Sequence, residues 1–342
     1  MSDVVRVRGL LVALLLAVLS VAGCSTASDG SPGGTEGSST LKSVGPKQAP
    51  GDDVCGQATP ANGTRRVVHA MGATEVPADP QRIVVLDSDK LDTVCALGLQ
   101  DKLVGTIAIG SSPQPSYLGP TIAKVPTVGS IAEPSLEKIA ALHPDLILGS
   151  KFRTPDLYAG LSKIAPTVFT ETVGSTWQQN FLLDGKALRR GEAAAARLQD
   201  FQARAKKIGT EVDGGDADVS IVRFVKGGIR VYGPDSFSGQ VLDAAGISRP
   251  EFQQLNGAED RRFTEISEEE LNHADGKTIY VATYGSDNAA AEEAAIGSPL
   301  WKTLDGVKSG RAFRVQDEVW MTGIGVIAAD RILDDLRDSL TV

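Results

Sequence analysis

The sequence predicts an α/β protein built from two similar lobes. Apolar, β-branched segments alternate with helical segments, which is typical of parallel sheets covered by helices. Residues 135–148 and 267–281 also share one pattern: a serine, an acidic residue two positions later, a His-x-Asp turn and an apolar run. A long stretch without proline separates the two copies. Two lobes built on one plan predict a ligand-binding cleft between them.

The repeated pattern also has a purely structural explanation. A serine followed by acidic residues is a common helix start, because the serine oxygen caps free N–H groups and carboxylates favour the positive end of the helix dipole. Ser267 and Glu270 fit a capping box. The repeated pattern is therefore consistent both with a structural role as a helix start and with a functional role.

The elements of the first lobe follow one another at short intervals. A helix over residues 90–97 ends at Gly98, which is a favourable residue at a helix C-terminus. Continuous apolar runs predict buried strands at residues 82–86, 103–107, 125–128, 146–148 and 167–169.

Residues 176–212 interrupt this alternation and predict a helix that links the lobes. The stretch is rich in Ala, Arg, Gln and Leu, with apolar residues at helical spacing. A single helix of this length would span more than about 50 Å. Gly185 and Gly191 are the positions where it could be interrupted.

The α/β alternation returns in the second lobe. Residues 220–225 and 229–232 predict a hairpin joined at Gly227-Gly228. The remaining elements are a helix over residues 239–245, strands at 278–282 and 312–315, and a closing helix over 325–340.

The N-terminus predicts an exported lipoprotein. Arg6 and Arg8 precede the apolar residues 10–21, and small residues come directly before Cys24. This arrangement resembles a bacterial lipobox, in which the cysteine is lipidated and becomes the new N-terminus. A transmembrane anchor is the alternative, but a span needs about 18 or more apolar residues. The Ser- and Gly-rich residues 25–51 predict a flexible tether.

The net charge and the number of cysteines argue against several kinds of ligand and favour one disulfide. The formal net charge of −9 argues against nucleic acid and against broad attraction to anionic lipid. Of three cysteines, lipidation of Cys24 leaves Cys55 and Cys95, and in an exported protein such a pair favours a disulfide. Unlinked thiols are the alternative. Three cysteines do not suit a structural zinc site.

The sequence contains no convincing constellation of catalytic residues. His69, His143 and His273 are predicted in turns or at the surface rather than at the carboxyl ends of strands, where ligands bind in open α/β sheets. No Gly-x-Ser-x-Gly elbow or Walker-type loop is present. Residues 323–328 match Gly-x-Gly-x-x-Ala but open the last helix of the chain, so a closely packed helix start is expected there. The sequence therefore predicts no enzyme, no cofactor and no metal site.

Loops that leave the predicted strands supply the candidate ligand-binding residues. Aromatic faces and arginine forks suit a bulky, anionic, partly aromatic ligand. Any one of these residues could instead be an ordinary loop or core residue. The candidates are Asp87, Ser111, Tyr117, Lys151, Arg153, Arg223, Tyr232, Phe237, Arg262, Tyr284 and Trp320.

The chain resembles the iron-siderophore binding proteins of ABC importers. The resemblance rests on residues 81–86, on residues 91–99 and most specifically on residues 134–148, and it covers residue 65 to the C-terminus. Within that family the chain is similar to FecB-like lipoproteins of actinobacteria, which share the paired cysteines and residues 115–119. The resemblance implies a class III (TroA/FhuD-like) substrate-binding fold, with two α/β lobes joined by one long helix.

The resemblance also implies an organisation and a function. The expected parts are a signal peptide (1–23), a lipidated Cys24 with its tether (24–64), an N-terminal lobe (65–174), an interlobe helix (175–213) and a C-terminal lobe (214–342). Glu137 and Glu269 match the glutamates with which relatives dock into arginine pockets of the permease. The expected ligand is a ferric siderophore, of the carboxymycobactin type or another ferric chelate, captured by a monomer on the outer face of the membrane. The alternatives are haem, and a cell-envelope role without transport.

Overall fold

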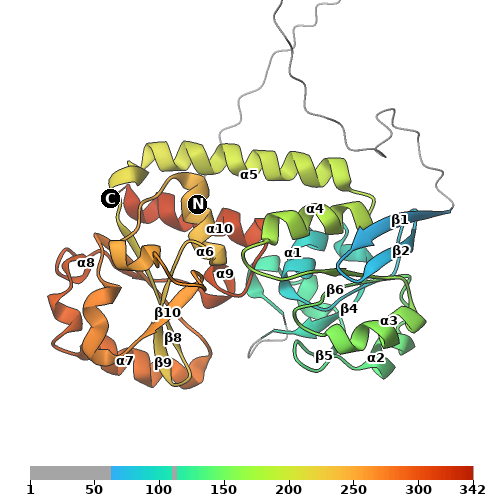
Figure 1. Cartoon of the computed structure of the whole chain (residues 1–342), viewed down its shortest axis with the longest axis horizontal. Helices are drawn as coiled ribbons and strands as arrows, with labels where there is room; N and C mark the ends of the chain where they lie inside the picture. The colour runs from blue at the N-terminus through green and yellow to red at the C-terminus, as the bar shows by residue number, and fades with distance from the viewer. Residues whose placement is uncertain (1–62, 110–113, 342) are drawn as a thin grey trace, which may run out of the picture. The chain divides into compact units, whose positions relative to one another are not determined.

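The N-terminal lobe contains a parallel sheet with strand order β5-β4-β3-β6-β7. The computed structural model describes residues 63–109 and 114–341 (Figure 1). All five predicted strands of this lobe are confirmed, within a few residues. They are β3 (Ile83–Val85), β4 (Leu103–Ala108), β5 (Thr127–Ser130), β6 (Leu146–Ser150) and β7 (Thr167–Thr170).

Helices cover both faces of this sheet. Helix α1 (Ser88–Ala96) packs with α4 (Trp177–Ala187) on one face, and α2 (Leu136–Ala141) with α3 (Tyr158–Ile164) on the other. The antiparallel hairpin of β1 (Thr64–His69) and β2 (Gly72–Pro77) was not predicted. Its short alternating strands contribute only Val67 and Val76 to the core, so their apolar signal is weak.

The C-terminal lobe contains a mixed sheet with strand order β10-β9-β8-β11-β12. The predicted hairpin of β8 (Val219–Val225) and β9 (Gly228–Tyr232) is confirmed, and β10 (Phe263–Ile266), which was not predicted, extends it. The parallel strands β11 (Thr278–Thr283) and β12 (Ala312–Arg314) complete the sheet. Its helices are α6 (Phe237–Ala245), α7 (Ala289–Gly297), α8 (Asp305–Lys308), α9 (Asp317–Trp320) and α10 (Val326–Leu340).

One long helix, α5 (Gly191–Glu211), contacts elements of both lobes. It packs on α4 from the N-terminal lobe and on α6 and α10 from the C-terminal lobe (Figure 1). The predicted helix over 175–213 is nevertheless divided, because residues 188–190 separate α4 from α5 and Arg189 has a φ of 56°. Gly185 permits the close approach of the two helices, since a Cβ there would lie 2.5 Å from the Cβ of Ala194.

The repeated pattern forms matching turns in the two lobes. Ser135 caps α2, whereas the second copy begins a 3-10 helix (Glu268–Ala274) whose Ser267 and Glu270 form the predicted capping box. The aspartates of the two His-x-Asp turns accept equivalent backbone hydrogen bonds. Asp145 accepts from the N–H groups of Gln81 and Arg82, and Asp275 from those of Asp305 and Gly306. These aspartates therefore have a structural role.

Candidate functional site

A cavity of about 440 Å³ lies between the two lobes. It is formed where β3, β6, β8 and β11 end, which is the edge at which open α/β sheets bind ligands. A second cavity of about 440 Å³ adjoins it and shares Ile109, Tyr284 and Thr322. The first cavity is lined by Ser88, Ile109, Ile131 and Arg153 from the N-terminal lobe, and by Arg223, Val225, Lys226, Arg230, Tyr284, Met321, Thr322 and Ile324 from the C-terminal lobe.

Arg153 follows β6 and is held by a buried carboxylate. Its Nε donates to Asp87 Oδ2 at 3.0 Å, and Ser150 Oγ donates to the same oxygen at 3.4 Å. Asp87 is fully buried at the start of α1, so it orients Arg153 rather than facing the cavity. Burial and the nearby Asp89 raise the pKa of Asp87, while Arg153 favours its charged form.

Arg223 on β8 is the most firmly held cation of the cavity. Its Nε and Nη2 donate to the two carboxylate oxygens of Asp317 at 2.6 and 2.7 Å, a bidentate arrangement. Its Nη1 donates to the Tyr232 hydroxyl at 3.3 Å. The guanidinium carbon also lies 4.8 Å from the ring centroid of Tyr284, which is 40% exposed.

Two further cations, Lys226 and Arg230, come from the β8–β9 hairpin. Arg230 pairs with Glu265 at 2.9 Å and lies over the ring of Phe263 at 4.3 Å. Lys226 forms no ion pair with any other residue that the structure describes. Together with Arg153 and Arg223, the cavity carries four cations and three partner carboxylates, so its net charge is positive.

Four predicted aromatic residues are not part of the cavity lining. Trp320 is fully buried, stacks on Tyr280 at 4.5 Å and donates from Nε1 to Asp335. Phe237 packs in the core against Trp177. Tyr232 is 8% exposed and contacts Arg223, and the hydroxyl of Tyr117 donates to Asp92. Their large side chains fill the core of the C-terminal lobe and the junction between the lobes.

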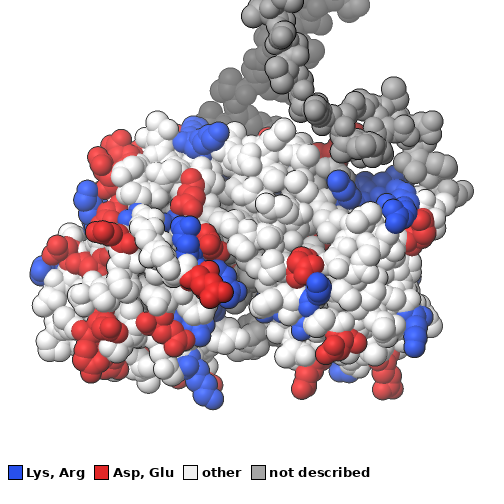
Figure 2. Space-filling model, in the orientation of Figure 1, with Lys and Arg blue, Asp and Glu red and all other residues white. Residues whose placement is uncertain are grey.

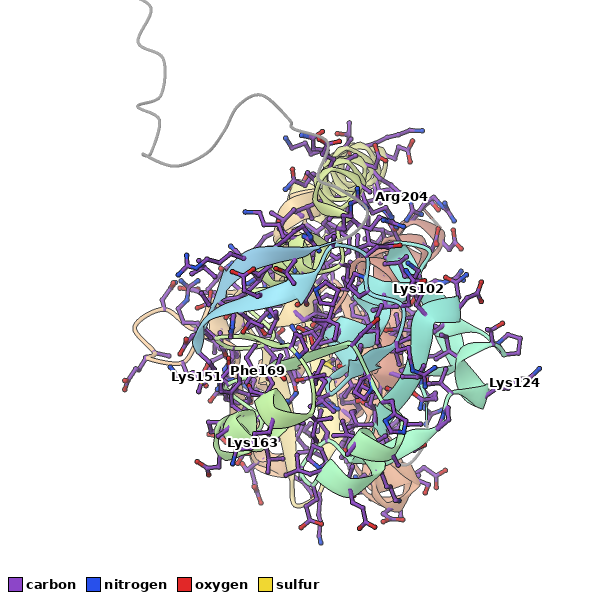
Figure 3. All side chains as sticks on the ribbon, turned by 90° about the vertical axis from the view of Figure 1, so that its right-hand side faces the viewer. Lys102, Lys124, Lys151, Lys163, Phe169 and Arg204 are labelled. Carbon is purple, nitrogen blue, oxygen red and sulfur yellow. The ribbon has the colours of Figure 1, made fainter. Side chains whose placement is uncertain are left out.

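Two predicted cations lie at the surface and pair with carboxylates there. Lys151, labelled in Figure 3, pairs with Glu171 at 2.7 Å, and Arg262 pairs with Asp260 at 2.7 Å. Figure 2 shows acidic and basic side chains interspersed over the face in view. Ser111 lies outside the described residues. Of the eleven candidates, Arg153, Arg223 and Tyr284 are brought together at the cavity.

Several residues that line the cavity were not predicted from the sequence. One of them, Arg230, could have been predicted from the hairpin. In the hairpin Val225 pairs with Gly228, and counting back along both strands places Arg230 opposite Arg223. The turn residue Lys226 belongs to the same hairpin. Ile131, Met321, Thr322 and Ile324 had no comparable signal, because their loops come together only through the packing of the lobes.

A buried ion cluster lies directly behind the N-terminal wall of the cavity. Lys90 is fully buried, and its Nζ lies 2.8 Å from Asp89, 3.0 Å from Asp184 and 2.9 Å from Thr170 Oγ1. Burial lowers the pKa of Lys90, but the two carboxylates outweigh this effect and leave its pKa raised. Burial raises the pKa of Asp184 to about 7 despite Lys90. The cluster fixes α1, whose first residue, Ser88, lines the cavity.

None of the three histidines lines the cavity. His69 bonds to Thr74 through Nε2, and His273 stacks on Phe252 with ring centroids 3.7 Å apart. His143 occupies the turn before β6, with a φ of 46°. Over residues 63–109 and 114–341, no group of three His, Cys, Asp or Glu side chains is placed to hold a metal ion.

The structure describes Cys95 but not the N-terminal residues on which the other predictions about cysteines and export depend. Cys95 lies on α1 and is partly buried, and burial together with Asp92 raises its pKa to about 12. Cys24, Cys55, the signal segment and residues 24–62 of the tether lie outside the described residues, so the lipid anchor and the disulfide stay predictions. Within the described part of the chain, no helix is long and apolar enough to cross a membrane.

Two α/β lobes joined by a long helix, with a cationic cavity between them, define a class III substrate-binding protein. Residues 83–319 match the family described as periplasmic binding protein, and the chain belongs to that family. It is 38% identical over 284 residues to the probable siderophore-binding lipoprotein YfiY of Bacillus subtilis, covering 80% of this chain and 87% of that one. It is 30% identical to the achromobactin-binding periplasmic protein of Dickeya dadantii, covering 75% and 85%.

Solved structures agree with this assignment. The crystal structure of Staphylococcus aureus SirA with staphyloferrin B matches with a TM-score of 0.71 and 29% identity, covering 81% of this chain and 98% of that one. The first two relatives are named as binding proteins, for a siderophore and for achromobactin, and the SirA structure contains staphyloferrin B.

The burial of Trp320 leads to a prediction about stability. Replacing Trp320 by phenylalanine removes the donor to Asp335 and the indole from the stack on Tyr280. We expect a loss of about 1–3 kcal/mol in the free energy of unfolding, because a partly buried carboxylate loses its partner. Urea unfolding measures this loss, and ligand affinity should stay unchanged. A tenfold loss of affinity at wild-type stability would instead assign Trp320 to the ligand site.

Proposed function

We propose that the protein captures a ferric siderophore in the cavity between its lobes and delivers it to an ABC permease. The observation that carries this proposal is the gathering of Arg153, Arg223, Lys226 and Arg230 around one cavity at the carboxyl ends of the strands. Iron that is already chelated needs no protein ligands, which agrees with the positions of the three histidines outside the cavity. Relatives named for siderophores, achromobactin and Fe(3+)-citrate support the same ligand class.

The lining of the cavity favours an anionic chelate. Guanidinium forks bind free carboxylate, phenolate or hydroxamate oxygens at the edge of a chelate, and each charge-assisted hydrogen bond contributes about 1.5–3 kcal/mol. A ferric carboxymycobactin fits this description, and ferric citrate fits it as well. Haem is the alternative, for which Tyr284 and Met321 are the lining residues that would suit a flat apolar ring.

Titration of the purified protein tests the proposal. Ferric carboxymycobactin, ferric staphyloferrin B, ferric citrate and haem are added separately while tryptophan fluorescence is followed. Saturable quenching by one of the ferric chelates, absent with its iron-free form, is the expected result. Saturation by haem alone would replace the proposal with haem capture, and saturation by none would overturn both.

We also infer that lipid on Cys24 holds the protein at the outer face of the cell membrane. Two relatives from Bacillus subtilis are named lipoproteins, which supports this inference. The anchor would keep the binding protein close to its permease. Labelling cells with a radioactive fatty acid tests it, since the label should enter the wild-type chain and be lost in Cys24→Ala.

Glu137 and Glu269 are proposed to bind arginine pockets of the permease, one on each lobe. Both side chains are exposed, in the first turns of the helices that begin the two copies of the repeat. Arginine–carboxylate pairs are directional, so one contact on each lobe would fix orientation as well as add attraction.

Changing both glutamates to lysine is expected to abolish uptake without affecting ligand capture. The reason is that like charges would then face each other across the docking interface. Ligand affinity of the purified variant and whole-cell uptake of the radioactive ferric chelate are measured together. The matched control changes Glu251 and Glu259, acidic residues outside the repeat, to lysine. Intact uptake in the Glu137→Lys/Glu269→Lys variant would leave both glutamates as helix-start residues only.

A further inference from the structure

Residues 317–328 run from the C-terminal wall of the cavity to the N-terminal lobe. At one end Asp317 binds Arg223 through two hydrogen bonds. In the middle Met321, Thr322 and Ile324 line the cavity. At the other end the segment forms the N-terminus of α10, which meets α1 of the N-terminal lobe. One segment therefore connects the ligand cavity with the junction between the lobes.

Asp92 of α1 is the group that receives the end of this segment. Asp92 is fully buried, and its Oδ1 and Oδ2 accept hydrogen bonds from the backbone N–H groups of Ile327 and Ala328, both at 3.0 Å. The hydroxyl of Tyr117 donates to Oδ2 at 3.2 Å. Free N–H groups and the positive end of the helix dipole point at this side chain and favour its ionised form, against the cost of burying it. A side chain of one lobe thus caps a helix of the other.

The Gly-x-Gly-x-x-Ala motif of residues 323–328 makes this contact possible. A Cβ at Gly325 would lie 2.2 Å from Asp92 Cγ, so only glycine allows the carboxylate to reach the helix. The backbone of Gly325 is extended, with a φ of −147°, so close approach rather than backbone conformation requires the glycine. A Cβ at Gly323 would lie 2.9 Å from the Tyr117 hydroxyl oxygen. Gly325 therefore makes room for Asp92, whereas Gly323 makes room for Ala328 and the Glu318 carbonyl as well as for Tyr117.

Ile324, between the two glycines, has a strained backbone. Its φ is 53°, in the left-handed region that β-branched residues rarely adopt. Such a conformation persists only where the surrounding structure holds it in place. Hydrogen bonds constrain the chain on both sides of Ile324. On the C-terminal side Asp92 accepts from Ile327 and Ala328, and on the N-terminal side Glu318 accepts from the Ser116 N–H at 3.0 Å.

We propose that Asp92 is a positioning residue of the ligand site. By fixing the start of α10, it holds residues 321–325 in the conformation in which Met321, Thr322 and Ile324 form part of the cavity wall. The same contact sets the position of the two lobes on either side of the ligand. This inference rests on the proposed function, because it assigns that cavity to the ligand.

Replacing Asp92 by asparagine tests the inference. Asparagine has nearly the same shape as aspartate, but only its carbonyl oxygen can accept a hydrogen bond. Its NH2 group would face one of the two backbone N–H groups, and two donors cannot form a hydrogen bond. We expect the affinity for ferric staphyloferrin B or ferric citrate to fall about tenfold, through faster dissociation. Tyr117→Phe removes only one donor and should weaken binding about threefold. That milder variant keeps the inference testable if Asp92→Asn does not fold.

Thr93→Val is the matched control. Thr93 is the next residue of α1, is equally buried, and its hydroxyl bonds only to the Asp89 carbonyl within the same helix. It should lose stability but keep wild-type affinity. Hydrogen exchange at the amides of residues 321–325 gives a readout without ligand: faster exchange is expected in Asp92→Asn and not in Thr93→Val. Equal exchange in the two variants would overturn the inference, whether or not any probe binds.

A pH profile separates positioning from a general loss of stability. Burial raises the pKa of Asp92 to about 7, against the hydrogen bonds from Ile327, Ala328 and Tyr117. The other ionisable groups around this junction are Tyr117, Cys95, Arg197 and Glu318. At pH 8 the ionised Asp92 accepts all three bonds, whereas at pH 5.5 it is protonated and resembles asparagine. The ratio of wild-type to Asp92→Asn affinity should therefore fall from about ten toward one as the pH is lowered. A ratio independent of pH would contradict the role given to the carboxylate.

If the wild-type protein binds no ferric probe, the proposed function fails, and the exchange measurement still decides the place of Asp92 in the junction. If the wild type binds a probe and Asp92→Asn binds it equally well, the positioning role fails and the proposed function stands.

Discussion

Replacing Lys90 by methionine is expected to destabilise the folded protein severely. The change removes the cation that compensates Asp89 and Asp184 in a fully buried site, with Asp87 close by. Leaving buried carboxylates without their partner costs about 3–5 kcal/mol, a large share of the roughly 5–15 kcal/mol that stabilises a typical domain. Circular dichroism and urea unfolding measure the effect. Methionine has a similar length, so lost packing makes a minor contribution.

The pH dependence of this variant identifies the cause. Asp184 has a folded-state pKa of about 7, above the ordinary value of 3.8, so the folded protein holds a proton that the unfolded chain releases. The stability contributed by this group is therefore complete below pH 3.8 and is lost as the pH rises through 7. Lys90→Met should regain stability between pH 8 and pH 5, because the carboxylate of Asp184 takes up a proton over this range.

Lys102→Met is the control for Lys90→Met. Lys102 also pairs with an aspartate, Asp79, at 2.9 Å, but both side chains are partly exposed. Its loss should cost less than about 1 kcal/mol, as is usual for exposed ion pairs. Equal stability of the two variants would show that the buried cluster contributes no more than a surface pair.

Replacing Arg223 by alanine is expected to weaken ligand binding by at least about 100-fold. Two charge-assisted hydrogen bonds to the chelate would be lost, each contributing about 1.5–3 kcal/mol. In addition, the carboxylate of Asp317 would face the anionic ligand without its guanidinium partner. Isothermal titration with ferric staphyloferrin B and ferric citrate measures the loss.

Two further variants make this experiment decisive. Combining Arg223→Ala with Asp317→Asn should restore part of the affinity, because it removes the uncompensated negative charge. Arg262→Ala should bind normally, since Arg262 pairs with Asp260 at the surface and does not line the cavity. Normal binding by Arg223→Ala together with weak binding by Arg262→Ala would move the ligand site to the loop of residues 260–262.

Part of the site was predictable because strand ends are visible in the sequence. Arg153 follows the buried run that became β6, and Tyr284 follows the run that became β11. The ends of parallel strands meet at one edge of a sheet, so these positions pointed to the cleft without further information. The same reasoning wrongly included Lys151, which faces outward near Arg153. The direction of a side chain in a loop follows no periodic pattern, so the sequence could not distinguish the two residues.

Aromatic residues were the least predictable part of the site. Trp320 and Phe237 occur in loop or helix-start positions beside the predicted strands, yet both are buried in the core. A large ring serves equally well as a ligand platform and as core filling, and only the neighbouring elements decide between them. For Trp320 these are Tyr280 on β11 and Asp335 on α10.

By itself the sequence determined the two α/β lobes, the strands of the N-terminal sheet, the β8–β9 hairpin and a helix start at the Gly-x-Gly-x-x-Ala motif. These features depend on periodicity, turns and caps, which act over a few neighbouring residues. The tertiary structure decided where the linking helix is interrupted and which loop side chains line the cavity. It also decided that Asp92 packs against the glycine motif at the start of α10. Those outcomes depend on contacts between distant residues, such as Asp92 with Ile327 and Arg223 with Asp317, which form only when the two lobes pack.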